Sequence, residues 1–187
     1  MKAVGLITED QSDVDVLHEL AKKIATRRFR IKRFLGHGCG RIHAKSNAWA
    51  HQLGMQGCTL LIIACDLDGR NAVEYRNLLE QAVSPCPIRD YMIVIPIQEI
   101  EAWLLADNSA VTQALKLQRP MKAQANPETV SDPKRLLARI VRERSGDRIT
   151  YLNTVHNRAI ATHIQIPNLR RCVSFRQFEE FIRSHLT

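Results

Sequence analysis

Residues 59–69 read TLLIIACDLDG, a nearly continuous apolar run that ends in two aspartates separated by one residue. A strand covered on both faces shows this pattern, because neither of its faces meets water and its residues need not alternate. Such strands are typical of parallel sheets flanked by helices. The apolar run is also far shorter than the roughly 20 residues of a membrane-spanning helix, so we expect no membrane span.

Strand and helix patterns alternate on both sides of this run. Residues 2–8 and 29–35 carry strand patterns, and a fourth strand is expected over residues 91–96. Residues 36–40, GHGCG, predict a loop. This alternation predicts an α/β fold with a parallel, doubly wound sheet, right-handed crossovers and ligands at the carboxyl ends of the strands. The expected helices cover residues 14–24, capped by Ser12 or Asp13, and residues 42–55, 71–82 and 99–106.

The pattern changes after residue 107. Residues 118–133 are polar and contain prolines, residues 134–144 form a basic amphipathic pattern, and residues 175–186 predict a closing helix. We therefore expect residues 1–107 to form the α/β core and residues 108–187 to form a basic helical extension packed on it.

The net charge of +8 is unevenly placed. Residues 1–107 carry 13 basic and 13 acidic side chains, whereas residues 108–187 carry 14 basic and 6 acidic ones. A basic flank suits a polyanion such as nucleic acid, although a solvated basic surface is an open alternative. The candidates for phosphate contacts are Lys134, Arg135, Arg139 and Arg142, with a second cluster of Arg27, Arg28, Arg30, Lys32 and Arg33.

The five cysteines show neither a C-x-x-C pair nor zinc-ribbon spacing. We expect them to be reduced, and we expect Cys39 and the histidines around it, His37, His43 and His51, to be ordinary loop and helix residues. The N-terminal residues lack the apolar core and cleavage site of a signal peptide, so we expect a cytoplasmic protein.

Carboxylates follow three of the four predicted strands. Glu9 follows the first strand, Asp66 and Asp68 follow the third, and Glu99 and Glu101 follow the fourth. Because the carboxyl ends of parallel strands share one edge, we expect these side chains to meet there. Crowded like charges are unfavourable unless a cation neutralises them, and a set of carboxylates suits magnesium.

Each acidic residue also has a simpler interpretation. Asp68 could cap a helix, and Glu9, Glu99 and Glu101 could complement the dipole of a first helical turn. Rival motifs fail: Arg70 stands where a haloacid-dehalogenase phosphatase has Thr or Val, and the 36–40 loop lacks the ending and spacing of phosphate-binding loops.

Several short motifs together resemble a known group of proteins. They are Thr8-Glu9-Asp10, Ser12-Asp13, Asp66-Leu67-Asp68, residues 98–107 (QEIEAWLLAD), Asp132-Pro133-Lys134, and Cys172 with Phe175. Over nearly the whole chain these residues resemble a Toprim-like family akin to the overcoming-lysogenisation-defect nucleases. Residues 101–107, EAWLLAD, are the most specific part of the resemblance.

The resemblance implies a Toprim-like fold and metal-dependent hydrolysis of phosphodiester bonds in DNA or RNA. It assigns catalysis and Mg²⁺ or Mn²⁺ binding to Glu9, Asp66 and Asp68, with Glu101 as the fourth carboxylate and Glu99 as a weaker metal ligand. The chain departs from the pattern at Asp10, where the family usually has glycine.

The resemblance also implies a role in phage defence with a partner ATPase. A non-catalytic Toprim-like subunit that binds an ATPase or nucleic acid is the alternative, and nucleotidyl transfer ranks lowest because no separate nucleotide-binding element is evident. The oligomeric state is not indicated by the sequence.

Overall fold

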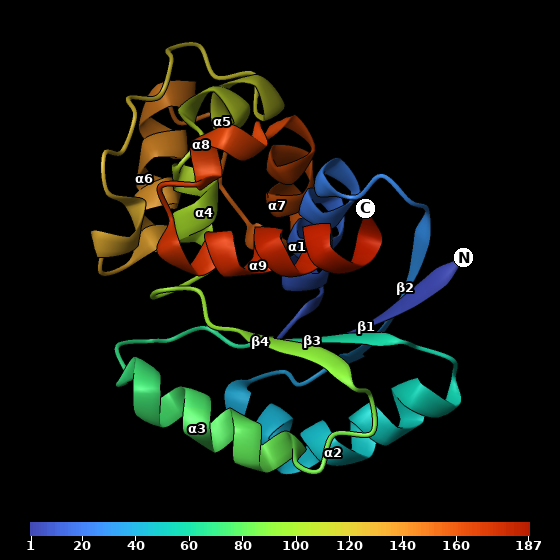
Figure 1. Cartoon of the computed structure of the whole chain (residues 1–187). Helices are drawn as coiled ribbons and strands as arrows, with labels where there is room; N and C mark the ends of the chain where they lie inside the picture. The colour runs from blue at the N-terminus through green and yellow to red at the C-terminus, as the bar shows by residue number, and fades with distance from the viewer.

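The four predicted strands form one parallel sheet in the computed structural model, which describes all 187 residues (Figure 1). The order across the sheet is β2-β1-β3-β4, and every neighbouring pair is parallel. The predicted α/β architecture is therefore confirmed. The strands are β1 (Lys2–Thr8), β2 (Phe29–Leu35), β3 (Leu60–Ala64) and β4 (Asp90–Val94).

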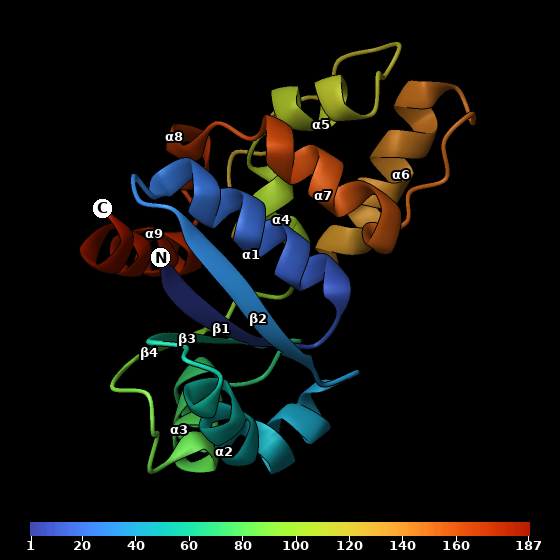
Figure 2. The ribbon, with the colours of Figure 1, turned by 90° about the vertical axis from the view of Figure 1, so that its right-hand side faces the viewer.

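Helices cover both faces of the sheet. One face carries α2 (Cys39–Met55) and α3 (Ala72–Val83), and the other carries α1 (Gln11–Ile24) and α9 (Val173–Leu186) (Figures 1 and 2). The chain moves outward from β1 to β2 and then returns past β1 to β3. Right-handed crossovers in opposite directions place their helices on opposite faces, which explains this arrangement.

The two faces bury separate hydrophobic clusters. Leu60 and Ile62 of β3 belong to the cluster of 34 buried residues beneath α1 and α9, whereas Leu61 and Ile63 belong to the 17-residue cluster beneath α2 and α3. All five residues of β3 are buried. This double coverage explains why the sequence run shows no alternation.

The C-terminal part of the chain extends the α1 face of the sheet. Its α7 packs against both α1 and α5, and one hydrophobic cluster contains residues from before and after residue 107 (Figure 2). Helix α4 (Glu101–Leu105) leads from the sheet into this part of the chain. The helices that follow it are α5 (Asn108–Ala114), α6 (Pro133–Ser145), α7 (Asn153–His163) and α8 (Ile166–Leu169), with a 3₁₀ turn η1 (Pro127–Thr129).

Trp103 on α4 anchors this arrangement. Its ring is fully buried and contacts Phe175 and Phe178 of α9, and its indole nitrogen donates a hydrogen bond to Ser174 Oγ at 2.8 Å. Trp103 is therefore a core residue.

The structure corrects several predicted boundaries. Helix α1 is capped by Asp10, whose side chain accepts hydrogen bonds from the backbone of Ser12 and Asp13, and not by either of those residues. Helix α2 begins at Cys39, three residues before the predicted start. Helix α4 begins at Glu101 because the preceding segment turns through Gln98, whose φ is +64°.

The single turn α8 was not expected from the sequence, and neither were helices α5 and α7. Their sequences, NSAVTQA and NTVHNRAIATH, are short and rich in polar residues. Most of the stability of such short helices comes from tertiary packing, which the local pattern does not reveal. No helix in the structure combines the length and apolar character needed to cross a membrane.

Candidate functional site

The carboxyl ends of β1 and β3 lie side by side where the strand order reverses. Ile7 of β1 pairs with Ile63 of β3. Glu9 comes two residues after Ile7, and Asp66 comes three residues after Ile63. The Glu9 carboxylate accepts a hydrogen bond from the Asp66 backbone nitrogen at 3.2 Å. Open α/β sheets bind ligands at this position, outside the strand ends at the topological switch point.

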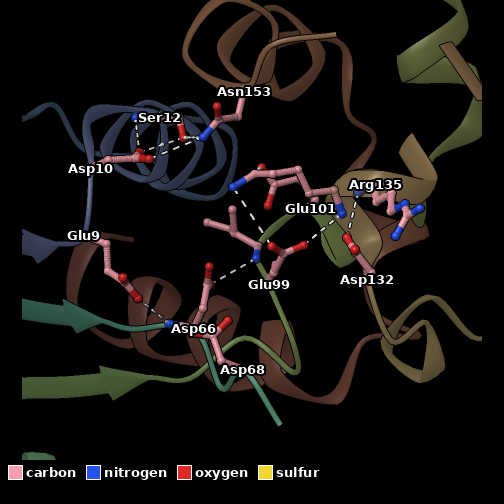
Figure 3. A network of polar contacts seen from close by, with 12 residues as sticks. Glu9, Asp10, Ser12, Asp66, Asp68, Glu99, Glu101, Asp132, Arg135 and Asn153 are labelled. Carbon is pink, nitrogen blue, oxygen red and sulfur yellow. Dashed lines mark hydrogen bonds and ion pairs between the residues drawn. The ribbon is translucent and has the colours of Figure 1, made fainter. Parts of the chain in front are cut away.

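The end of β4 contributes to the same edge. Asp66 Oδ1 accepts a hydrogen bond from the backbone nitrogen of Ile100 at 3.1 Å, immediately before Glu101 (Figure 3). Side chains from three strand ends therefore gather at one edge, as their sequence positions predicted. We call the six carboxylates found there the acidic cluster; they are Glu9, Asp13, Asp66, Asp68, Glu99 and Glu101.

Asp66 lies in the centre of the acidic cluster. Its pKa is raised well above the ordinary value, first by burial and then by the charges of Asp13, Glu101, Glu9 and Asp68. The charges of four other carboxylates therefore disfavour ionisation of Asp66. This is the electrostatic arrangement that a bound cation would relieve.

Asp13 is the member of the acidic cluster that the sequence analysis missed as a site residue. Burial and the neighbouring carboxylate of Asp10 raise its pKa to about 8, with smaller contributions from Glu101 and Glu9. The Asp13 carboxylate also accepts a hydrogen bond from the Asp10 backbone nitrogen at 3.1 Å. The sequence analysis names Asp13 as a helix cap and as part of the family resemblance, but not as a site residue. Its place on the first turn of α1, four residues after Glu9, is the signal that points to the site.

Glu101 is almost completely enclosed, with 1% of its surface exposed. Its Oε1 accepts a hydrogen bond from Asn157 Nδ2 at 3.1 Å and lies 3.4 Å from the Tyr151 hydroxyl. Burial raises its pKa, while Lys134 and Asn157 act in the opposite direction. Tyr151 and Asn157 were not predicted as site residues because they come from the extension, about 50 residues away in sequence.

Glu99 points towards the start of α6. Its Oε2 accepts a hydrogen bond from the Lys134 backbone nitrogen at 2.9 Å, and its Oε1 lies 4.0 Å from the Lys134 ammonium (Figure 3). The same ammonium lies 3.9 Å from Glu101. Burial alone would lower the pKa of Lys134, but Glu101, Glu99 and Asp66 together raise it. Lys134, predicted to contact phosphate, therefore lies beside the acidic cluster.

Asp68 occupies the outer rim of the acidic cluster. Its side chain is 47% exposed and accepts a hydrogen bond from Arg70 at 3.1 Å. Its φ of +48° is a conformation that aspartate adopts more readily than most residues. Asp68 can therefore reach a ligand from the solvent side, opposite the enclosed Glu101.

The acidic cluster fits magnesium or manganese by its donor chemistry. It offers only carboxylate oxygens, which hard divalent cations prefer, and its six carboxylates meet only the cations Lys134 and Arg70. The only three potential ligands of cysteine, histidine or carboxylate type within 4.8 Å of one another are Glu9, Cys39 and Cys65. No three of the carboxylates come this close to one another, so holding an ion among three of them requires their side chains to move together.

The predicted phosphate-contacting arginines differ in their surroundings. Arg135 and Arg139 are exposed and line an open groove of about 540 Å³ beside the start of α6. Arg142 is instead paired with Asp147. The second basic cluster, from Arg27 to Arg33, lies on and just before the edge strand β2, where charged side chains also discourage edge-to-edge pairing.

Cys39 makes a contact that was not predicted from the sequence. It is the first residue of α2, and its thiol donates a hydrogen bond to Glu9 Oε1 at 2.8 Å. The neighbouring His37, His43 and His51 are not part of the group formed by Glu9, Cys39 and Cys65.

The fold and the site define an α/β protein with an acidic cluster at the switch point of a parallel sheet. The chain belongs to the family described as a domain of unknown function (DUF4276), which matches residues 8–183. The match includes every member of the acidic cluster and Lys134. No curated protein and no solved structure matches the chain.

Proposed function

We propose that this protein is a metal-dependent nuclease that hydrolyses phosphodiester bonds of DNA or RNA. The observation that carries the proposal is the meeting of Glu9, Asp66 and Glu101 with Asp13 at the switch point of the sheet. The resemblance of the chain to Toprim-like nucleases supports the same chemistry. A cytoplasmic setting in phage defence, with a partner ATPase, is part of the proposal. The role in phage defence and the partner come from that resemblance.

Asp66, Asp68 and Glu9 would hold Mg²⁺ or Mn²⁺, with Asp13, Glu101 and Glu99 completing the site. A divalent ion bound there supplies a charge that neutralises phosphate oxygens and makes water more acidic. The enclosed position of Glu101, held by Asn157, keeps one wall of the site fixed.

The remaining groups would position the substrate and move protons. Glu9, half-exposed at the end of β1, has an alternative to metal binding, which is to accept a proton from an attacking water molecule. Lys134 presents its ammonium beside the acidic cluster, where it can contact the scissile phosphate. Arg135 and Arg139, one and two helical turns into α6, can bind flanking phosphates.

Cleavage assays with matched variants test this proposal. Purified protein is incubated with single-stranded and duplex DNA and RNA in the presence of Mg²⁺ or Mn²⁺. We expect Asp66→Asn and Asp68→Asn to reduce cleavage by roughly 100-fold or more, because metal ligands act as a unit. Glu80→Gln and Glu180→Gln, which remove exposed carboxylates elsewhere, should cleave normally.

Full cleavage by Asp66→Asn would contradict the proposal. Metal-independent binding of nucleic acid with no cleavage by any form would favour the non-catalytic subunit instead.

A further inference from the structure

We infer that Glu9, Cys39 and Cys65 form a second metal site, which takes zinc or another thiophilic divalent ion. The site lies on the α2 side of the strand ends and shares Glu9 with the acidic cluster. Neither the cysteine spacing nor the proposed nuclease chemistry accounts for this group.

Three separate elements bring the ligand atoms together. Glu9 follows β1, Cys39 begins α2, and Cys65 directly follows β3. Their two sulfur atoms and a Glu9 oxygen all lie within 4.8 Å of one another, and Cys39 Sγ is 2.8 Å from Glu9 Oε1. A tetrahedral zinc ion with sulfur ligands at about 2.3 Å and an oxygen ligand at about 2.1 Å holds its ligand atoms about 3.6–3.8 Å apart. Cys39 and Glu9 reach that range once they move apart by about 0.8 Å, as they would when the ion replaces the thiol proton between them.

Tyr75 provides an independent indication of a ligand here. Its side chain is 6% exposed, and its hydroxyl is the one buried side-chain polar atom in the structure without a hydrogen-bond partner. The hydroxyl lies beside the thiols of Cys39 and Cys65. Buried hydroxyls are nearly always hydrogen-bonded, and a metal-bound thiolate would accept this proton.

The surroundings favour a thiolate at Cys39 and allow an ion to enter, whereas Cys39 and burial raise the pKa of Cys65. Cys39 is at the N-terminus of a 17-residue helix, where the free backbone N–H groups favour negative charge. The Arg70 guanidinium lies 4.9 Å from the Tyr75 ring and adds positive charge nearby. Glu9 and Cys39 are half-exposed, whereas Cys65 forms the floor at 2% exposure. Each thiol loses its proton on binding, so one zinc ion releases two protons to solvent.

Sharing Glu9 couples this site to the acidic cluster. A thiophilic ion that holds the Glu9 carboxylate against the cysteines takes it away from the Asp66 side. Zinc is therefore expected to weaken magnesium binding and to inhibit cleavage. This coupling rests on the proposed function, whereas zinc binding itself does not.

Cobalt titration of the whole reduced protein tests the inference, because cobalt replaces zinc and its bonds to thiolate absorb in the near ultraviolet. We expect this absorption to saturate at one equivalent and to disappear when zinc is added. Cys39→Ser and Cys65→Ser should each remove most of it, and Tyr75→Phe should weaken affinity by roughly 10-fold. The matched controls Cys86→Ser and Cys58→Ser, which are half-buried and buried elsewhere, should leave it unchanged.

Absence of the thiolate absorption, or its persistence in both Cys39→Ser and Cys65→Ser, would overturn the inference. Circular dichroism checks that each variant folds. If Cys65→Ser fails to fold, the half-exposed Cys39→Ser and the Tyr75→Phe variant decide the matter. The titration does not depend on cleavage. Zinc binding by a protein whose zinc-free form does not cleave nucleic acid with Mg²⁺ or Mn²⁺ would therefore contradict the proposed function and still support this site.

Discussion

Asp13 shows most directly how the acidic cluster affects stability. Its pKa of about 8 arises from burial and from neighbouring carboxylates, so the folded protein binds this proton more tightly than the unfolded chain does. A group with a raised pKa stabilises the fold below its unfolded pKa, and that contribution disappears as pH rises through the folded pKa. For Asp13 this loss extends from about pH 4 to about pH 8.

We therefore predict that Asp13→Asn flattens the pH dependence of stability. In EDTA, the free energy of unfolding of the parent protein should fall by about 1–2 kcal/mol more than that of the variant between pH 6.5 and 8.5. Urea unfolding at several pH values measures the difference. Carboxylates with lowered pKa values, such as Glu179, are fully ionised over this range and do not affect the comparison.

If the free energy of unfolding of the parent protein and of Asp13→Asn changed with pH in the same way, Asp13 would not be part of the acidic cluster. Added Mn²⁺ should reduce the loss of stability at high pH, because it binds the ionised carboxylates of the folded state.

At the scale of individual residues, the sequence located part of the site. Glu9 and Asp66 were found because each follows a strand, and strand ends in a parallel sheet share an edge. Asp13, Tyr151 and Asn157 were not found, because their roles depend on how α1 and α7 pack over that edge. The contact of Cys39 with Glu9 was not predicted, because the two residues are 30 positions apart in the sequence.

The arginines on helix α6 differ in whether they are paired with an acidic side chain. Arg135 and Arg139 line the open groove, whereas Arg142 is already paired with Asp147. We predict that Arg135→Ala and Arg139→Ala each weaken nucleic-acid binding and lower the slope of log affinity against log salt by roughly 1. Fluorescence anisotropy over a range of salt concentrations measures this. Arg142→Ala is the matched control, and an equal effect in all three would indicate only a diffuse basic surface.

Helix α4 couples the acidic cluster to the core, since Glu101 and Trp103 are both on it. We predict that Trp103→Ala lowers the free energy of unfolding by about 3–5 kcal/mol, because it empties a buried position and leaves Ser174 without its donor. Urea unfolding is the measurement. Val155→Ala, at an exposed position on α7, should change stability by less than about 0.5 kcal/mol, and a similarly small change for Trp103→Ala would contradict the packing described here.

At the level of elements, the strands were predictable and the short helices were not. The apolar runs of β1 and β3 are enough to identify them as strands from the local sequence, because burial on both faces leaves a continuous apolar pattern. Helices α5 and α7 depend on contacts with each other and with α1, so their sequences carry only a weak local signal.

The whole molecule joins two layers of helices through a sheet whose strand order reverses between β1 and β3. Because of that reversal, the carboxyl ends of the strands are covered by α1 on one face and by α2 on the other. The carboxylates lie on the α1 side, the thiols lie on the α2 side, and Glu9 lies between them. The extension contributes Lys134, Tyr151 and Asn157 to this edge, so the site is assembled from the full length of the chain. The sheet architecture could be predicted from the sequence. The contribution of the extension to the site could not, because it depends on how the extension packs on the sheet.

The central claim is that the acidic cluster binds a divalent metal ion. A crystal soaked in Mn²⁺ and measured for anomalous scattering tests it most directly. We predict a manganese peak between Asp66, Asp68 and Glu9, within bonding distance of at least two of their carboxylates, and its loss in Asp66→Asn crystals. A peak confined to another part of the molecule, or none at saturating Mn²⁺, would contradict the claim.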